Sequence, residues 1–370
     1  MYLKQLKLAN FKNYTEVDFN FSAKINCFIG NNGVGKTNVL DAIYYLSFCK
    51  SYFNSVDAQN INHNEEFFAI HGLYDRSGDK RDQISCQLKR NHKKKFKKNK
   101  KEYDRLADHI GVYPLVMISP YDRDLINDGS ELRRKFIDSV ISQFDKLYLN
   151  NLINYNKVVT QRNALLKQFA ERNFFDYSSL EIWDDKMIEL GKEIYKKRVS
   201  FLKDFEPIFK HYFDFISDGS EEVSIEYFSK LEDNDFSALL KESLNKDRAV
   251  RYSTVGVHKD DLVFKIGDYP IKKFGSQGQQ KSFVIAIKLA QFEYTRKIKG
   301  FKPILLFDDI FDKLDNNRVE KLIMLVSKNS FGQVFITDTQ KERIEYLFKE
   351  LDIDHKIFEI SEGNVKEIVE

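Results

Sequence analysis

Apolar and polar residues alternate along the N-terminal part of the chain with the period of two that half-buried strands show. An apolar run that begins at Ile25 ends at Gly30 and predicts a buried strand, whereas apolar positions between residues 38 and 48 recur at helical spacing. A short apolar run at 112–119 predicts another buried strand, with Pro114 near its start. The alternating segments are residues 2–8, 17–19, 67–74 and 83–88.

From Leu132 the spacing becomes helical, and apolar residues recur at steps of three to five positions through Phe169. Residues 173–179 break this pattern, and a second helical pattern runs from Trp183 to Phe209. The two segments predict a helical hairpin, the first arm being either continuous or interrupted. The hairpin is far too short for the extended coiled-coil arms of chromosome-maintenance proteins.

Strands and helices alternate in the C-terminal part, which implies parallel pairing in an α/β sheet. The strand that ends at Gly30 must join this sheet. The sequence therefore predicts a discontinuous α/β domain made of residues 1–125 and 250–370, with residues 126–249 inserted as a helical lid domain. The expected elements are helices at 279–297, 317–327 and 341–351, and strands at 223–227, 262–266, 303–307, 333–337, 356–360 and 365–369.

The loop after the strand that begins at Ile25 has the spacing G-x-x-x-x-G-K-[ST], with a strand before it and a helix after it. Backbone N–H groups of such a loop point at a phosphate, and the helix N-terminus adds partial positive charge. Lys36 is expected to neutralise the β- and γ-phosphates, and Thr37 to ligate Mg²⁺. A glycine-rich turn before an ordinary helix is the alternative, which the full spacing disfavours. The predicted nucleoside triphosphate site comprises Gly30, Asn31, Asn32, Gly33, Val34, Gly35, Lys36 and Thr37.

An apolar run that begins at Pro303 ends in two carboxylates, Asp308 and Asp309. The carboxyl end of a strand in an α/β sheet faces the ligand crevice. Asp308 is therefore placed to hold Mg²⁺ directly or through water, and Asp309 to orient or deprotonate the attacking water. Alone this pattern is weak, but together with a phosphate loop it predicts ATP hydrolysis with Lys36, Asp308 and Asp309 as catalytic residues.

A Ser-x-Gly-Gln segment, with Ser276, Gly278 and Gln279, stands immediately before a predicted helix. A small hydroxyl, a flexible backbone and unpaired N–H donors are the parts of an anion site. Each subunit already has one phosphate-binding loop. A second anion site in the same subunit is therefore expected to bind the γ-phosphate of a nucleotide held by another subunit. The alternative is a simple N-capped helix start.

Lys and Arg number 59 against 56 Asp and Glu, so any nucleic-acid surface must be a local patch. Between Lys89 and Lys101, nine of thirteen residues are Lys or Arg. This density predicts a hairpin arm that contacts DNA phosphates, the alternative being a solvated turn with DNA bound on the head surface. The candidate DNA contacts are Lys93, Lys94, Lys95, Lys97, Lys98, Lys100 and Lys101.

The three cysteines, Cys27, Cys49 and Cys86, form no paired or metal-binding pattern, which favours a reduced, cytoplasmic setting. The first residues lack the apolar block of a signal peptide, and no apolar run approaches 18 residues. No membrane span is expected.

Phosphate loop, Ser-x-Gly-Gln segment and acidic strand are the three motifs of ABC-type ATPases. Within that group, the chain resembles the RecF family of bacterial recombination mediators over nearly its whole length. Segments in the middle of the chain are more specific to this resemblance than the general ATPase motifs. The segments that carry it are 6–14, 30–38, 40–44, 118–120, 132–138, 161–166, 256–262, 275–281, 305–309 and 313–315.

The resemblance implies an ABC-type ATPase head with an inserted helical lid that dimerises on ATP and hydrolyses it slowly, as a weak DNA-dependent ATPase. It also implies binding to double-stranded DNA and gap junctions, and work with RecR and RecO partners to help load RecA. Ser276, Gly278 and Gln279 would have the trans signature role, and Asp315 would belong to the interface loop after the acidic strand.

Some positions depart from the pattern of ABC ATPases. Thr337 stands where many of them place a switch histidine, and residues 118–120 occupy the approximate place of the glutamine loop without a glutamine. His258 and Asp260 match a family motif without a role that the sequence explains. Two other classes stay open: an ABC-type energy subunit that drives a protein or membrane partner, and a nucleotide-dependent structural protein with negligible turnover. A GTPase is disfavoured because no Asn-Lys-x-Asp motif occurs.

Overall fold

The computed structural model describes residues 1–76, 80–217, 219, 221–310, 316–327, 331–344, 354–361 and 363–368. The chain forms two compact units, Met1–Asp122 with Ile287–Glu370, and Arg123–Ala286. No helix within the described ranges is long and apolar enough to cross a membrane.

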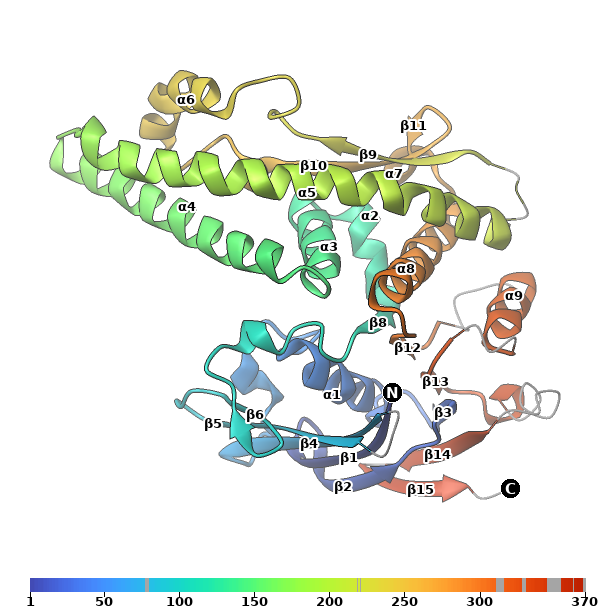
Figure 1. Cartoon of the computed structure of the whole chain (residues 1–370). Coiled ribbons are helices and arrows are strands. Elements are labelled where there is room, and N and C mark those ends of the chain that lie inside the picture. Colours follow the sequence, from blue (N-terminus) through green and yellow to red (C-terminus); the bar gives the residue numbers. More distant parts are fainter. Residues whose placement is uncertain are drawn as a thin grey trace. The chain divides into compact units, whose positions relative to one another are not determined.

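A mixed sheet in the first unit combines strands from both parts of the chain (Figure 1). Its order is β15 (Asn364–Ile368), β14 (His355–Ser361), β3 (Ile25–Ile29), β13 (Val334–Asp338), β12 (Ile304–Phe307) and β8 (Leu115–Ile118). From β14 to β8 the neighbouring strands are parallel, and β15 pairs antiparallel with β14 at the edge. Every residue of β3, β8, β12 and β13 is buried, which explains why apolar residues dominate these strands. The expected parallel α/β sheet, including the phosphate-loop strand, is confirmed.

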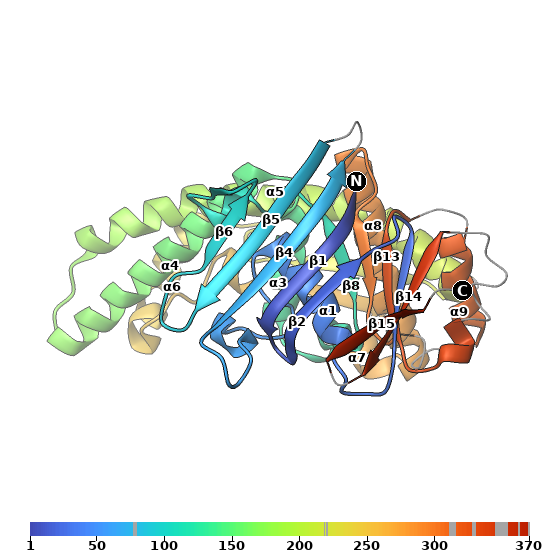
Figure 2. The same ribbon diagram turned by 90° about the horizontal axis from the view of Figure 1, so that it is seen from below.

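A second sheet of the first unit is antiparallel (Figure 2). Its order is β2 (Tyr14–Asn20), β1 (Tyr2–Phe11), β4 (Phe67–Arg76), β5 (Lys80–Lys89), β6 (Lys95–Lys98) and β7 (Lys101–Glu102). The alternating pattern predicted β1, β2, β4 and β5. It did not predict β6 and β7, because lysines conceal the alternation there.

Helix α1 (Lys36–Phe48) contacts strands of both sheets, including β4 and β13, and nearly all of its side chains are buried. Gln333, which is buried just before β13, joins the sheets: its side chain accepts from the backbone N–H of Leu3 at 2.7 Å and donates to the carbonyl oxygens of Leu3 and Ser22. The phosphate-loop helix therefore sits inside a continuous apolar core. The unit also contains η1 (Asp57–Asn60), η2 (Leu106–Asp108) and α9 (Asn316–Ser327).

The second unit is mainly helical and carries a small antiparallel sheet (Figure 1). Its elements in chain order are α2 (Asp124–Asn127), α3 (Ser130–Ser142), α4 (Lys146–Arg172), α5 (Tyr177–Ser217), β9 (Val223–Phe228), α6 (Phe236–Val250), η4 (Val257–Lys259), β10 (Asp261–Ile266), β11 (Tyr269–Pro270) and α7 (Ile271–Phe274). α4 and α5 form the predicted helical hairpin. The first arm is interrupted where Asp145 caps α4 by accepting a 2.8 Å hydrogen bond from the backbone N–H of Tyr148.

One boundary of the second unit differs from the expectation, and one helix was not predicted. The boundary expected between 249 and 250 lies instead at 286/287, inside α8 (Gln277–Lys299), because β10 pairs with β9 and keeps residues 250–286 with the helices. The sequence pattern also did not predict α6, although its Asp235 cap accepts from Ala238. Of the helix expected at 341–351, residues 341–344 are helical and the rest lies outside the described residues, as does Asp315.

Candidate functional site

The phosphate loop joins the end of β3 to the start of α1. Gly30, Gly33 and Gly35 all have positive φ angles, 145°, 84° and 114°. A Cβ on Gly35 would lie 2.4 Å from Asn13 Nδ2, and one on Gly30 would lie 2.4 Å from the carbonyl oxygen of Ile360. Backbone conformation and packing both require glycine at these two positions.

Residues of the β1–β2 turn brace this loop from outside. Asn13 Nδ2 donates to the Val34 carbonyl oxygen at 2.8 Å, and Asn38 Nδ2 donates to Asn13 Oδ1 at 2.7 Å. The Tyr14 hydroxyl donates to the Gly35 carbonyl oxygen at 3.1 Å. The loop is thus held in a fixed shape by side chains that the sequence pattern did not single out.

Lys36 is buried at the start of α1. Its Nζ donates to the carbonyl oxygens of Gly30 at 2.7 Å and Asn31 at 2.9 Å. The ammonium group therefore lies against the loop that its own motif forms. A neighbouring cation, Lys12, forms a 2.7 Å ion pair with the buried Asp41 of α1, so it has a structural partner.

Asp308 lies where the parallel strands end together, and it meets two hydroxyl groups there. Its Oδ1 accepts from Thr37 Oγ1 at 2.8 Å and from Thr337 Oγ1 at 3.1 Å. Burial raises the pKa of Asp308, while the two hydroxyl donors act in the opposite direction. The structure thus brings Thr37 and Asp308 together from opposite ends of the chain.

Thr337 is a site residue whose contacts the sequence did not reveal. Its hydroxyl donates to Asp308 and accepts a 2.8 Å hydrogen bond from the backbone N–H of Asp309. Asp309 has a φ of 49°, a conformation that is strained for a residue with a Cβ and that recurs at functional sites. Thr337 therefore holds both acidic residues at the end of β12.

A further acidic residue, Asp122, lies in η3 (Pro120–Arg123), just after β8. It forms a 2.6 Å ion pair with the buried Lys288 and accepts from the Tyr52 hydroxyl and from the backbone N–H of Ser119. Burial raises the pKa of Tyr52, and the charge of Asp122 adds to the effect. Because the N–H of Asp308 donates to Ile118, this cluster fixes residues 118–120 beside the acidic strand.

The Ser-x-Gly-Gln segment belongs to the second unit, where it starts α8. Ser276 Oγ accepts from the backbone N–H of Gln279 at 3.2 Å, and Gln279 Oε1 accepts from the backbone N–H of Ser276 at 2.5 Å. This reciprocal pair is a capping box. The side chain of Gln279 also donates to Glu221. Ser276 remains exposed, so the N-cap does not hide its hydroxyl.

The basic run is part of the antiparallel sheet and not a separate arm, since β6 pairs with β5. Phe96 is buried and Lys95 is exposed, as the strand pleat requires. Lys94 is only 11% exposed, pairs with Asp57 at 2.6 Å and donates to the carbonyl oxygen of Cys49. Lys98 pairs with Asp82 at 3.0 Å. Of the candidate DNA contacts, Lys93, Lys95, Lys100 and Lys101 are exposed and Lys97 is half-buried.

Two buried arginines hold the helices of the second unit together. Arg162 is fully buried on α4, and it donates to Asp184 of α5 at 2.5 Å and to Asp247 of α6 at 2.6 Å. Arg198 of α5 forms a bidentate pair with Asp138 of α3. Removing one partner of such a buried pair costs about 3–5 kcal/mol. The segments around Leu132 and Gln161, which carry part of the family resemblance, therefore serve the packing of this unit.

The segment that contains His258 and Asp260 is held by hydrogen bonds to other residues of the same unit. Tyr155 donates to His258 Nδ1 at 2.9 Å, and His258 Nε2 lies 3.2 Å from the carbonyl oxygen of Ser253, so the imidazole is neutral with its proton on Nε2. Burial lowers the pKa of His258 to about 4. Asp260 accepts from Tyr227 and Ser229, and burial raises its pKa. Both residues therefore have structural roles.

The chain is similar to known proteins over nearly its whole length. The sequence matches the family described as RecF/RecN/SMC N terminal domain over residues 2–356. It is 55% identical to the DNA replication and repair protein RecF of Flavobacterium johnsoniae, covering 97% of this chain and 100% of that protein. It is 49% identical to the protein of the same name from Phocaeicola vulgatus, covering 99% and 98%.

Solved structures are similar as well. The recombination mediator protein RecF with ATP, in the RecFOR pathway, superposes with a TM-score of 0.90 at 30% identity, covering 100% of this chain and 98% of that one. The Smc head domain of Pyrococcus furiosus superposes with a TM-score of 0.57 at 18% identity, covering 99% and 96%, and this likeness shows the fold alone, an ABC-type ATPase head. On sequence and fold together, the chain belongs to the RecF family.

Proposed function

We propose that this chain is an ATP-dependent DNA-binding protein of replication and recombinational gap repair, which dimerises on ATP and is reset by slow hydrolysis. The observation that carries the proposal is the hydrogen bond from Thr37 to Asp308 beside a complete phosphate loop. Relatives named for DNA replication and repair match nearly the whole chain, and a similar solved structure is named with ATP. An ABC-type fold supports ATP hydrolysis as the underlying reaction.

The residues present fit Mg²⁺ and ATP. The loop has no side chain at Gly30, Gly33 and Gly35, so its backbone can approach a triphosphate closely. Thr37 and Asp308 supply a hydroxyl and a carboxylate oxygen, which are the hard oxygen ligands that Mg²⁺ prefers. When bound, Mg²⁺ neutralises the charge that develops on the β- and γ-phosphate oxygens.

The chain's own residues then have distinct tasks. Lys36 exchanges its hydrogen bonds to the loop carbonyl oxygens for phosphate oxygens, which are stronger, charge-assisted partners. Asp309 orients the attacking water and accepts its proton, and Thr337 holds the backbone that positions this carboxylate. Burial raises the pKa of Asp308, its two hydroxyl partners oppose that rise, and a bound Mg²⁺ would favour the ionised carboxylate further.

The exposed Ser276 supports the trans role in an ATP-dependent homodimer. Its hydroxyl and the N–H groups at the start of α8 offer donors to the γ-phosphate of a nucleotide held by another copy. Gly278 allows close approach there, and Gln279 fixes the segment through the capping box. Asp315 is proposed for the same interface by family resemblance alone.

Double-stranded DNA and gap junctions are the proposed ligands, with mediator proteins of the RecR and RecO type as partners. The exposed lysines of β6, β7 and their turns are the candidate DNA contacts, because point charges on flexible stems suit phosphates. Lys94 and Lys98 support the sheet through their ion pairs and are therefore set apart from the direct contacts.

Phosphate release with and without duplex DNA tests this function. We expect slow hydrolysis that requires Mg²⁺, rises on addition of DNA and is lost in Asp309→Asn. Phosphate release no faster than in the variant would indicate a nucleotide-dependent structural protein. Normal turnover without any DNA effect or DNA shift would favour an energy subunit for another partner.

A further inference from the structure

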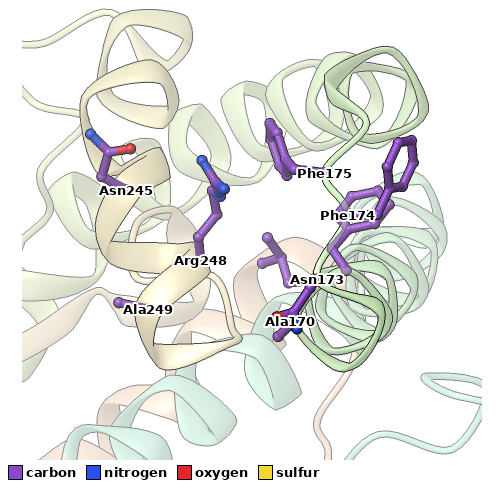
Figure 3. Close-up of a pocket in the computed structure, with 9 residues that line it drawn as sticks. Ala170, Asn173, Phe174, Phe175, Asn245, Arg248 and Ala249 are labelled. Atoms are coloured by element: carbon purple, nitrogen blue, oxygen red, sulfur yellow. The ribbon is translucent and has the colours of Figure 1, made fainter.

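A pocket of about 390 Å³ lies in the second unit, at the tip of the α4–α5 hairpin and against α6 (Figure 3). Its lining includes Leu166, Phe169, Phe174 and Phe175 from the hairpin and Asn245 and Arg248 from α6. None of these residues belongs to the proposed nucleotide site, signature segment or basic strands. The pocket is therefore a feature that ATP and DNA binding leave unexplained.

The walls of the pocket are fixed by contacts just below it. α4 ends at Asn173, which adopts a left-handed conformation and donates its N–H to the carbonyl oxygen of Phe169. About three turns of helix before this end, Arg162 joins α4 to Asp247, the neighbour of Arg248 on α6. Because this ion pair is buried, the spacing between the hairpin tip and α6 is set by the core of the unit.

Aromatic side chains form one part of the pocket wall, beside the polar side chains of Asn173, Asn245 and Arg248. Phe169 and Phe175 pack edge to face with ring centroids 5.4 Å apart. Phe174 is 62% exposed at the rim, although α4 and α5 bury many other aromatic side chains. Aromatic side chains are enriched at protein interaction sites.

Arg248 gives the pocket its charge. It is the charged residue of the lining, and its guanidinium carbon lies 4.1 Å from the centroid of the Phe175 ring. A guanidinium stacked on a ring presents its N–H donors along its edge, in the geometry that matches a carboxylate. The adjacent Asp247 does not neutralise it, because that carboxylate is buried and directed at Arg162 and Thr254.

We propose that this pocket binds a segment of a partner protein in which an apolar side chain stands next to a carboxylate. The apolar side chain packs beside Phe174 against the tip of the α4–α5 hairpin. The carboxylate pairs with the edge of the Arg248 guanidinium group. Asn173 and Asn245 have the amide groups that pair with a peptide backbone. The volume suits an anchor of one or two side chains, at the small end of ligand pockets.

The probe for this proposal is the capped peptide acetyl-Gly-Asp-Phe-Asp-Gly-amide, with the peptide that has Asn in place of both Asp as its neutral match. Ligand-observed NMR with the full chain measures both affinities. We expect millimolar binding of the acidic peptide and at least fivefold weaker binding of the neutral one. Arg248→Gln should abolish this difference, and Lys246→Gln, a change of the same charge on α6 outside the lining, should preserve it.

Equal affinity of the two peptides, or an unchanged preference in Arg248→Gln, would overturn the proposal. So would loss of duplex DNA binding in Arg248→Gln without any effect on the peptides, since this would assign the hairpin tip to nucleic acid. Far-UV circular dichroism of both variants checks that α6 remains folded. The proposal stands apart from the nucleotide site, and neither variant should change the rate of ATP hydrolysis.

Discussion

The Thr37 hydroxyl at the start of α1 donates a 2.8 Å hydrogen bond to the Asp308 carboxylate at the end of β12, a residue 271 positions further along the chain. This contact exists because β3, β13 and β12 are parallel neighbours, so that their carboxyl ends meet. It joins the phosphate loop to the acidic strand. These two motifs predict ATP hydrolysis only when they occur together. A nucleotide held by one is therefore within reach of the other.

Lys36→Ala should weaken binding of Mg²⁺ and ATP by at least about tenfold, or about 1.4 kcal/mol, because it removes the cation that faces the phosphates. Isothermal titration calorimetry measures the loss. Lys50→Ala, which removes an exposed lysine just after α1, is the control and should bind normally. Equal affinity of Lys36→Ala and the unchanged protein would contradict the assignment of the phosphate loop.

Ser276→Arg should leave ATP binding by the monomer near normal and abolish the ATP-dependent dimer, since a bulky cation cannot share a γ-phosphate pocket. Ser276→Ala is the control, because it removes the N-cap, at a cost of about 1 kcal/mol, without adding a bulky cation. Sedimentation velocity with ATP decides the matter, and a Ser276→Arg protein that still dimerises refutes the trans role.

Asp309→Asn should act in the opposite way. Without a carboxylate to orient and deprotonate water, hydrolysis slows while nucleotide binding persists, so the ATP-bound dimer should accumulate. The same sedimentation experiment, followed over time, measures its lifetime. A dimer that disappears as fast as in the unchanged protein would mean that another group activates the water.

Replacing Lys93, Lys95, Lys100 and Lys101 by Gln should weaken binding to duplexes of different sequence about equally. The salt dependence should flatten by about 0.9 log units per log unit of salt for each phosphate that the variant no longer neutralises. The matched control is the double variant Lys94→Gln and Lys98→Gln, which removes two ion pairs of the sheet. It should lower the melting temperature while changing the salt slope less than the fourfold variant does. An unchanged slope in the fourfold variant would place DNA elsewhere on the head.

His258 should make stability fall on acidification. Its pKa is lowered to about 4 in the folded chain, below the ordinary value of 6.5, so between these values the unfolded chain binds more protons. The contribution of a neutral His258 is thus complete above pH 6.5 and is lost as the pH falls toward 4, by about 2 kcal/mol between pH 7 and pH 5.

Urea unfolding of the unchanged protein and of His258→Gln at the two pH values measures this difference. The variant should be less stable at pH 7 and less sensitive to pH. His211→Gln, a change at an exposed histidine on α5, should keep the pH dependence of the unchanged protein. Parallel pH profiles of His258→Gln and the unchanged protein would exclude His258 as the source.

The sequence predicted those elements whose residue pattern has one local cause, such as burial or the geometry of a phosphate loop. Burial on both faces makes β3 and β12 largely apolar, and the glycine spacing follows from the loop that phosphate requires, so the strands and Gly30 to Thr37 were recognisable. Contacts between residues far apart in the sequence were not recognisable. The role of Thr337 depends on two strands being adjacent, and those of His258 and Asp260 depend on Tyr155, Arg198 and other residues far away in sequence.

Charge runs were the least reliable guide. The density of lysines between residues 89 and 101 is visible in the sequence, but the acidic partners of Lys94 and Lys98 are Asp57 and Asp82, which only the sheet brings near. The same holds for the domain boundary, since the antiparallel pairing of β9 with β10 joins segments that α6 separates.

The central claim, that ATP controls DNA binding, is tested most directly by fluorescence anisotropy of a labelled duplex with Mg²⁺ and either ATP or ADP. Asp309→Asn should show the effect most clearly because it retains ATP. We predict tight binding with ATP and weak binding with ADP, together with loss of the ATP effect in Ser276→Arg. Equal affinity with ATP and ADP in both the unchanged protein and Asp309→Asn would contradict this claim.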